Sequence, residues 1–291
     1  MDTQSVSGNA KSADCVSDGE AMPLTFTAVD GLAFAAAKGR LRRASKTRFA
    51  NDIGPLLELI HLSIDGLLPP LETLLSASAN AAHELCAALR RNERYWICPS
   101  TRRFGLLHTK DTESDISNSY NFGIAAQNAA VAAGFTKQVA RQLVAAIIEM
   151  VDNIYLHSKS SETGLAAFCA HRGAFEFVVS DRGVGLLRSL QQCSEYARLS
   201  DHGDALQLAL TDGCTRFGSD SKHGHGFRPL FTGLSNLNGS LRFRSGDHAL
   251  TIDGTNPASI PWAKIAKPNI SGFMASVLCR TGSAKITKHI A

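Results

Sequence analysis

Three polar side chains recur at intervals of four residues in a segment that otherwise has the pattern of a helix. In the stretch IIEMVDNIYLHS, residues 147–158, they are Glu149, Asn153 and His157. A period of 3.6 residues per turn places them one above another. A carboxylate with an amide oxygen one turn away can hold a hydrated Mg²⁺ ion and orient a water molecule. The alternative is a solvated polar face, although Asn is a poor helix former because its amide competes for backbone hydrogen bonds.

Two glycine-containing segments follow this stretch. DRGVG, residues 181–185, ends a predicted strand, where Asp181 could accept a hydrogen bond from an amino group such as that of adenine. Gly183 and Gly185 would let the backbone approach a ligand closely. GSDSKHGHG, residues 218–226, precedes a predicted helix, whose free N–H groups and dipole favour phosphate. Taken singly, each segment is also compatible with an ordinary Asp-Gly turn or a flexible surface loop.

The polar stripe requires a helix, and the sequence predicts one over residues 137–157 with Thr136 as its N-cap. An apolar stripe on the other side of this helix would face the core. It comprises Leu143, Ile147, Met150, Val151 and Ile154. Residues 164–170 and 174–180 predict two strands joined as a hairpin, so that DRGVG follows the second strand.

Further elements complete a predicted domain over residues 118–281. A helix of small residues ends at Gly134, and another helix is expected over residues 227–237. Strands are expected over residues 240–245, 249–253 and 272–279. This order predicts an α/β fold, a two-layer sandwich of a mixed sheet with helices on one face.

The residues before this domain predict a mostly helical N-terminal region, residues 23–117, of unknown role. Residues 24–29 alternate as in a strand, and helices are expected over residues 51–68 and 71–92. Residues 1–22 are polar and are expected to be a disordered tail, and residues 282–291 a C-terminal tail.

The order of the three segments resembles that of the GHKL superfamily of ATPases, which includes gyrase-type, chaperone, histidine-kinase and MutL proteins. In that superfamily an ExxxN helix, a DxGxG segment and a glycine-rich loop form the N, G1 and G2 boxes of a Bergerat-type ATP-binding fold. The resemblance covers about residues 118–280. The ExxxNxxxH helix is most similar to that of the anti-sigma-factor serine kinases. The segment LSNLNGSLRFRSG, residues 234–246, is similar to the part that follows the G2 box.

The resemblance implies ATP and Mg²⁺ as cofactors and assigns roles to the helical residues. Asn153 would coordinate the Mg²⁺ ion that bridges the phosphates. Glu149 would orient or deprotonate the attacking group, and His157 would line the phosphate side. Phosphoryl transfer needs mainly positioning and charge neutralisation, so this small set could suffice.

The resemblance also assigns the two glycine-containing segments. Asp181 would contact the adenine amine, while Gly183 and Gly185 would shape the pocket wall. Gly224 and Gly226 would let a lid close over the phosphates, and Lys222 would add a positive charge there.

Three functional hypotheses follow. The first is a small regulatory ATPase or a serine/threonine protein kinase of the anti-sigma type, which acts in signal transduction on a partner protein. The second is a non-catalytic switch in which bound ATP controls a partner without hydrolysis. The third is a histidine kinase that uses His61, although Leu62 stands where an acidic residue is expected. Ligand residues alone do not separate the first two, because they do not show whether a nucleophile is aligned.

Composition limits the remaining classes. The chain has 291 residues, a net charge of +4 without a dense basic cluster, and seven cysteines without a CxxC pair. We therefore expect no nucleic-acid partner. The cysteine pattern predicts a cytoplasmic protein whose thiols are reduced. No apolar segment approaches the ~18 residues that span a bilayer, so no membrane association is expected. Related ATPases are often dimers, which makes a homodimer a further possibility.

Overall fold

A computed structural model describes residues 21–41, 46–50, 52–76, 81–109, 114–209, 239–253 and 263–281. Within these ranges, six strands form one sheet in the order β3-β4-β5-β6-β8-β7, and each neighbouring pair is antiparallel. The strands are β3 (Tyr95–Ile97), β4 (Phe104–His108), β5 (Leu165–His171), β6 (Ala174–Asp181), β7 (Ser240–Asp253) and β8 (Ala263–Arg280). Two short strands, β1 (Met22–Pro23) and β2 (Thr47–Arg48), pair separately.

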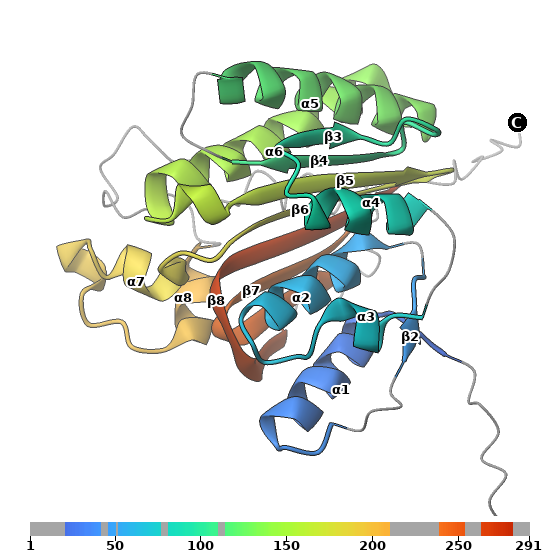
Figure 1. Ribbon diagram of the computed structural model, residues 1–291. Coiled ribbons are helices and arrows are strands. Elements are labelled where there is room, and N and C mark those ends of the chain that lie inside the picture. The colour runs from blue at the N-terminus through green and yellow to red at the C-terminus, as the bar shows by residue number, and fades with distance from the viewer. Residues whose placement is uncertain are drawn as a thin grey trace, which may run out of the picture.

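Helices lie on both sides of this sheet (Figure 1). The helices of the N-terminal part are α1 (Phe26–Ala37), α2 (Ile53–Ile64), α3 (Leu71–Leu74) and α4 (Ala81–Arg90). Those that follow are α5 (Ser114–Ala132), α6 (Lys137–His157), α7 (Gly185–Leu190) and α8 (His202–Ala209). Two single 3₁₀ turns, η1 (Ser161–Thr163) and η2 (Ser194–Tyr196), connect elements of this second group.

Alternating side chains on β6 separate the two faces of the sheet. Phe175, Phe177 and Val179 belong to an apolar cluster with the buried stripes of α5 and α6. Val178, which points the other way, belongs to a second cluster with the buried residues of α1, α2 and α4. The strand therefore buries both of its faces, as a period of two requires when each face is covered.

The predicted layer arrangement is wrong in two respects. The sheet is antiparallel rather than mixed, because consecutive strands are paired as the hairpins β3–β4, β5–β6 and β7–β8. Its helices cover both faces rather than one, because the N-terminal helices pack on the face away from α6. The α/β class itself is confirmed.

The local predictions around the candidate site are confirmed. Helix α6 has the predicted bounds, and the Oγ1 atom of Thr136 accepts a hydrogen bond from the Val139 amide at 3.3 Å. The strands β5 and β6 form the predicted hairpin. The segments predicted as two strands at 240–253 form the single strand β7, with an irregular register beside Gly246.

Two predictions for the N-terminal part are wrong. Residues 24–29 do not form a strand, because Thr25 accepts a hydrogen bond from the Ala28 amide and caps α1. The helix predicted over residues 71–92 is interrupted, and its described parts are α3 and α4. Strand β4 of this part pairs with β5, and the predicted boundary at residue 118 lies inside α5.

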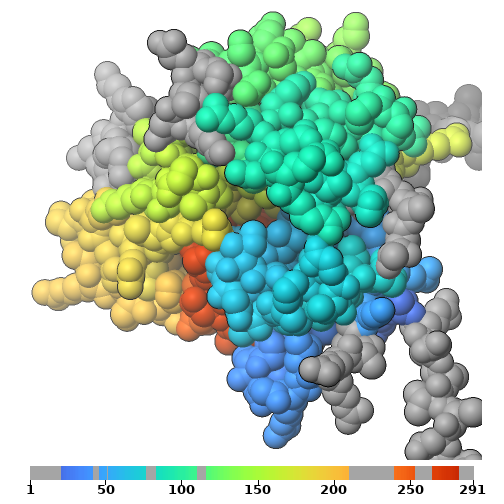
Figure 2. All heavy atoms as spheres, in the orientation of Figure 1, coloured from blue at the N-terminus to red at the C-terminus, as the bar shows by residue number. Residues whose placement is uncertain are grey.

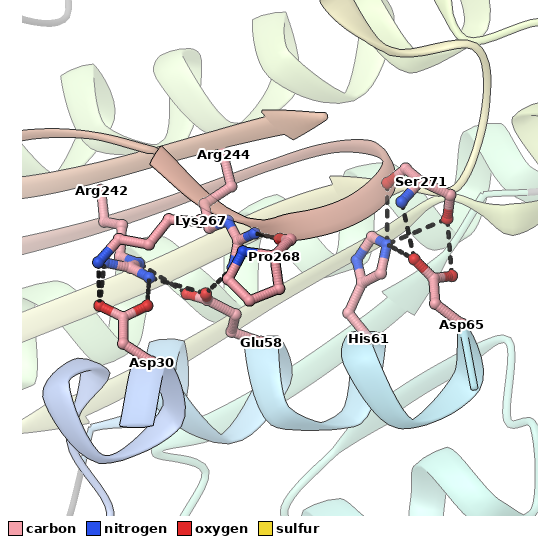
Figure 3. A network of polar contacts seen from close by, with 9 residues as sticks. All are labelled: Asp30, Glu58, His61, Asp65, Arg242, Arg244, Lys267, Pro268 and Ser271. Carbon is pink, nitrogen blue, oxygen red and sulfur yellow. Dashed lines mark hydrogen bonds and ion pairs between the residues drawn. The ribbon is translucent and has the colours of Figure 1, made fainter. Parts of the chain in front are cut away.

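A buried polar network fastens α2 to the sheet (Figure 3). The carboxylate of Glu58 accepts hydrogen bonds from Arg242 at 2.7 Å and from Arg244 at 2.6 Å, both on β7. The same Arg242 also donates to Asp30 of α1 at 2.6 Å. Because Glu58 and Arg244 are 0% exposed, each charge is neutralised by its partners rather than by water.

The first turn of α2 is capped by a residue of β6. The Glu176 carboxylate accepts hydrogen bonds from the amides of Ile53 at 2.6 Å and Gly54 at 2.9 Å, and from the Ser276 hydroxyl at 3.0 Å. Burial, with the neighbouring Asp52, raises the pKa of Glu176 to about 8, and these hydrogen bonds act in the opposite direction. A carboxyl group from the sheet thus satisfies amides that a helix start leaves open.

Among the described helices, none combines the length and the apolar character needed to cross a membrane.

Candidate functional site

The polar stripe of α6 lies away from the apolar cluster that holds the helix on the sheet. Met150 and Ile154 are 3% and 2% exposed and pack in that cluster. Of the stripe, Glu149 is exposed, while Asn153 and His157 are half-buried. The predicted separation of an apolar and a polar side is therefore present, and the stripe is accessible from outside the core.

Asp181 occupies the last position of β6, opposite Phe273 of β8. It alternates with Phe177 and Val179, so its side chain belongs to the face that α5 and α6 cover. The residue is only 5% exposed. Burial raises the pKa of the Asp181 carboxyl to about 6, and a hydrogen bond from the Gly183 amide at 2.8 Å opposes this effect. A carboxylate so poorly solvated is ready to accept a hydrogen bond from a ligand.

The end of α6 and the DRGVG segment are in direct contact. The carbonyl oxygen of Ser158, which follows α6, accepts a hydrogen bond from the Val184 amide at 2.9 Å. A Cβ atom added to Gly183 would lie 2.1 Å from the same oxygen, so a side chain cannot be accommodated there. The structure therefore brings the C-terminal end of α6 and the segment after Asp181 together at one end of the sheet, and explains why residue 183 is a glycine.

The DRGVG segment also contacts β7 and β8. Gly185 has φ = +74°, a conformation that favours glycine, and starts α7. The Leu186 amide donates a hydrogen bond to the Ser245 hydroxyl at 2.9 Å, and that hydroxyl donates to the Gly272 carbonyl at 2.8 Å. The sequence did not indicate Leu186, Ser245 or Gly272 as site residues, because a contact between segments so far apart leaves no local pattern.

The third predicted segment lies outside the described residues, together with the helix expected after it. This applies to Lys222, Gly224 and Gly226, and their predicted roles stay predictions.

The described residues offer few protein ligands for a metal ion. Nowhere among them do three His, Cys, Asp or Glu side chains gather into a metal site. A Mg²⁺ ion at Asn153 would consequently complete its shell with water and phosphate oxygens, the usual arrangement for Mg²⁺ beside a nucleotide. The half-buried amide of Asn153, on an accessible stripe, fits such a shared shell.

A cavity of about 430 Å³ lies on the opposite side of the same sheet end. Its walls include α2 with His61, α4 with Cys86, and the two neighbours of Asp181, Ser180 and Arg182. The hollow is visible in Figure 2 between the blue α2, the teal α4 and the yellow segment after β6. Because side chains alternate along β6, Asp181 faces α6 while its neighbours face this cavity.

His61, the phosphoacceptor of the third hypothesis, is 5% exposed. Its Nε2 atom donates a hydrogen bond to the Ser271 carbonyl oxygen at 3.0 Å, and burial lowers the pKa of the imidazole. An imidazole engaged in this way offers no accessible nitrogen lone pair at Nε2 for attack on a phosphate.

No model of a known protein family, no curated protein and no solved structure matches this chain.

Proposed function

We propose that this protein binds ATP with Mg²⁺ beside α6 and acts as a regulatory ATPase or serine/threonine kinase of the GHKL type. One observation carries the proposal: the DRGVG segment, with the buried carboxylate of Asp181, is hydrogen-bonded to the C-terminal end of the helix that bears Glu149 and Asn153. We take this contact as the base of a shared pocket, in which Asp181 would recognise adenine, Asn153 would hold the metal ion and Glu149 would act as the general base.

Each side chain has a defined task in this proposal. Asp181 accepts the hydrogen bond of the adenine amine, and Gly183 keeps the loop close enough to α6 to form the pocket wall. Asn153 holds Mg²⁺, which when bound neutralises charge on the phosphates. Glu149, one turn away and exposed, orients the attacking hydroxyl or water and accepts its proton. His157 lies one turn further, on the phosphate side.

A second candidate is a switch that binds ATP without turnover. The observation that favours it is the direct connection between α2 and the strands around Asp181, through Glu58 and His61. Such a connection could report the occupancy of the pocket to a partner protein through the N-terminal helices. Both candidates require the same nucleotide site.

Calorimetric titration of MgATP tests the site itself. Asn153→Ala should abolish the Mg²⁺ dependence of binding. Gln142→Ala is the matched control: Gln142 is an exposed amide on the same helix, and 11 residues, about three turns, separate it from Asn153 on the same side. Gln142→Ala should bind like the wild type. Equal, Mg²⁺-dependent binding by all three proteins would contradict the assignment of Asn153, and absence of binding by the folded wild type would contradict the proposed function.

A single-turnover measurement then separates the two candidates. With γ-labelled ATP bound, an ATPase or kinase releases or transfers the label, and Glu149→Gln should slow that step at least about 100-fold. Full retention of the label by the wild type, both alone and with candidate partners, would favour the switch.

A further inference from the structure

A β-bulge in β8 lies directly beside Asp181. The ladder between β7 and β8 passes from the pair Ser245–Phe273 to the pair Gly246–Ile270. Ser271 and Gly272 therefore stand outside the ladder, and their backbone groups need other partners. Bulges are frequent next to functional sites, where they redirect neighbouring groups.

Helix α2 supplies the partners of Ser271. Asp65, the C-cap residue of α2, accepts hydrogen bonds from the Ser271 amide and from the Ser271 hydroxyl, both at 2.7 Å. His61, one turn earlier, donates from Nε2 to the Ser271 carbonyl oxygen at 3.0 Å. Figure 3 shows both side chains directed from α2 toward the bulge. Each polar group of Ser271 is thus held by one helix.

Gly272 transmits this position to Asp181. It has φ = +62°, and a Cβ atom added to it would lie 2.1 Å from the Asp181 carbonyl oxygen and 2.7 Å from its Oδ1 atom. The glycine therefore packs on both the backbone and the carboxylate of Asp181. The Gly272 carbonyl oxygen accepts a hydrogen bond from the Ser245 hydroxyl. That hydroxyl in turn accepts a hydrogen bond from the amide of Leu186, which directly follows the DRGVG segment.

The location of α2 along the sheet is itself fixed. Glu58, His61 and Asp65 follow one another at spacings of three and four, so they share one face of the helix. The Glu58 carboxylate binds Arg242 and Arg244 of β7, and Glu176 caps the helix start. Because these contacts leave α2 little freedom to slide, the end of the helix is a rigid support for the bulge.

We propose that His61 and Asp65 are positioning residues, which hold the Ser271–Gly272 bulge so that the Asp181 carboxylate is oriented toward the adenine amine. The inference rests on the proposed function, and it adds that the N-terminal helices set the base selectivity of the pocket. Neither residue touches the nucleotide. A displacement of the C-terminal end of α2, by a partner protein for example, would weaken adenine recognition.

The test compares MgADP with MgIDP, in which a carbonyl group replaces the adenine amine. The wild type should prefer ADP. Asp65→Ala should weaken ADP binding about ten-fold, in line with the loss of charge-assisted hydrogen bonds, and should change IDP binding less than about two-fold. Asp65→Asn, which keeps one acceptor oxygen, should recover part of the preference. Glu72→Ala, which removes an exposed carboxylate that forms an ion pair with Arg90 on the surface, should match the wild type.

Several outcomes would overturn the inference. If Asp65→Ala keeps the full preference for ADP, or loses both nucleotides equally, His61 and Asp65 do not position Asp181. If the wild type binds ADP and IDP alike, the pocket exists but Asp181 does not read the base. If the wild type binds neither, the proposed function itself fails.

Ser271→Ala covers the case in which Asp65→Ala does not fold. It removes the hydroxyl group with its hydrogen bond to Asp65 at 2.7 Å and its longer contact with His61 at 3.5 Å, and it leaves the backbone of the bulge in place. We expect its preference for ADP to fall about two- to three-fold. An unchanged preference in this folded variant would also count against the inference.

Discussion

Helices α2 and α6 lie on opposite faces of one sheet and use their polar residues in opposite ways. Helix α6 packs on the sheet with apolar side chains and directs Glu149 and Asn153 away from it. Helix α2 is apolar as well, but it directs Glu58 and His61 toward the sheet, where both are buried. Glu149 and Asn153 thus lie on the outer side of α6, whereas Glu58 and His61 are hydrogen-bonded to the sheet.

The difference separates two uses of polar side chains in one fold. Apolar contact holds a helix without specifying its position closely, whereas a buried charge is satisfied in only one arrangement. A buried ion pair contributes little net stability, yet loss of one partner is costly because the other charge stays buried. Helix α2 is therefore held in one position, which is what a support for the Ser271–Gly272 bulge requires.

The largest expected effect comes from breaking the network under α2. Glu58→Ala leaves Arg244 buried without a counter-charge, and we expect the free energy of unfolding to fall by about 3–5 kcal/mol. Urea denaturation measures the change. The matched carboxylate on α6 is Asp152, which is exposed; Asp152→Ala should stay within about 0.5 kcal/mol of the wild type. Similar losses in both variants would remove the distinction between the helices.

The starts of the two helices offer a second, smaller contrast. Glu176→Ala removes the acceptor of two buried amides of α2, and we expect a loss of about 2–3 kcal/mol in unfolding free energy. The start of α6 has its own local cap, and Thr136→Ala should cost about 1 kcal/mol. Urea denaturation measures the unfolding free energy of both variants. A larger effect at Thr136 than at Glu176 would show that the long-range cap of α2 is not important.

The third prediction concerns pH and carries about a ten-fold effect. The ionised Asp181 carboxylate accepts a much stronger hydrogen bond from an amine than the protonated carboxyl group does, and the pKa of Asp181 is about 6. MgADP affinity should therefore rise with pH, and should be about ten-fold weaker at pH 5 than at pH 7. Asp181→Asn should bind weakly at both values. A flat profile for the wild type between pH 5 and pH 7 would exclude a role for this ionisation.

The pH dependence of stability that arises from Asp181 runs in the opposite direction from the pH dependence of nucleotide affinity. Folding raises the pKa of Asp181 from 3.8 to about 6, so the folded state holds its proton more tightly than the unfolded state. The contribution of Asp181 to stability is therefore complete below the unfolded-state pKa of 3.8, and it is lost as the pH rises through about 6. Nucleotide, which binds the ionised form, would offset that loss.

Local patterns predicted the part of the fold that positions the candidate site. The cap at Thr136, the apolar stripe of α6 and the turn after β5 are signals within a few residues, and each agrees with the structure. The strand predicted over residues 24–29 shows how such signals compete. There the alternation was real, but the cap formed by Thr25 starts a helix.

The remaining features depend on contacts between distant segments. His61 and Ser271 are separated by 210 positions, and Glu58 and Arg242 by 184, so no periodicity along the chain relates them. The same reason explains the wrong layer prediction, because nothing local to residues 53–64 shows which side of the sheet they cover. The sequence indicated Asp181 and Asn153 as candidates, whereas the bulge that supports Asp181 is formed by residues that no local pattern connects to it.

Hydrogen exchange with and without MgADP tests the central claim most directly, because it maps the bound nucleotide without a mutation. We predict slower exchange at residues 153–159 and 181–187, with little change in the hairpin at residues 95–108. Protection around the cavity at residues 86–92, without protection at residues 181–187, would contradict the account and place the nucleotide on the other face of the sheet.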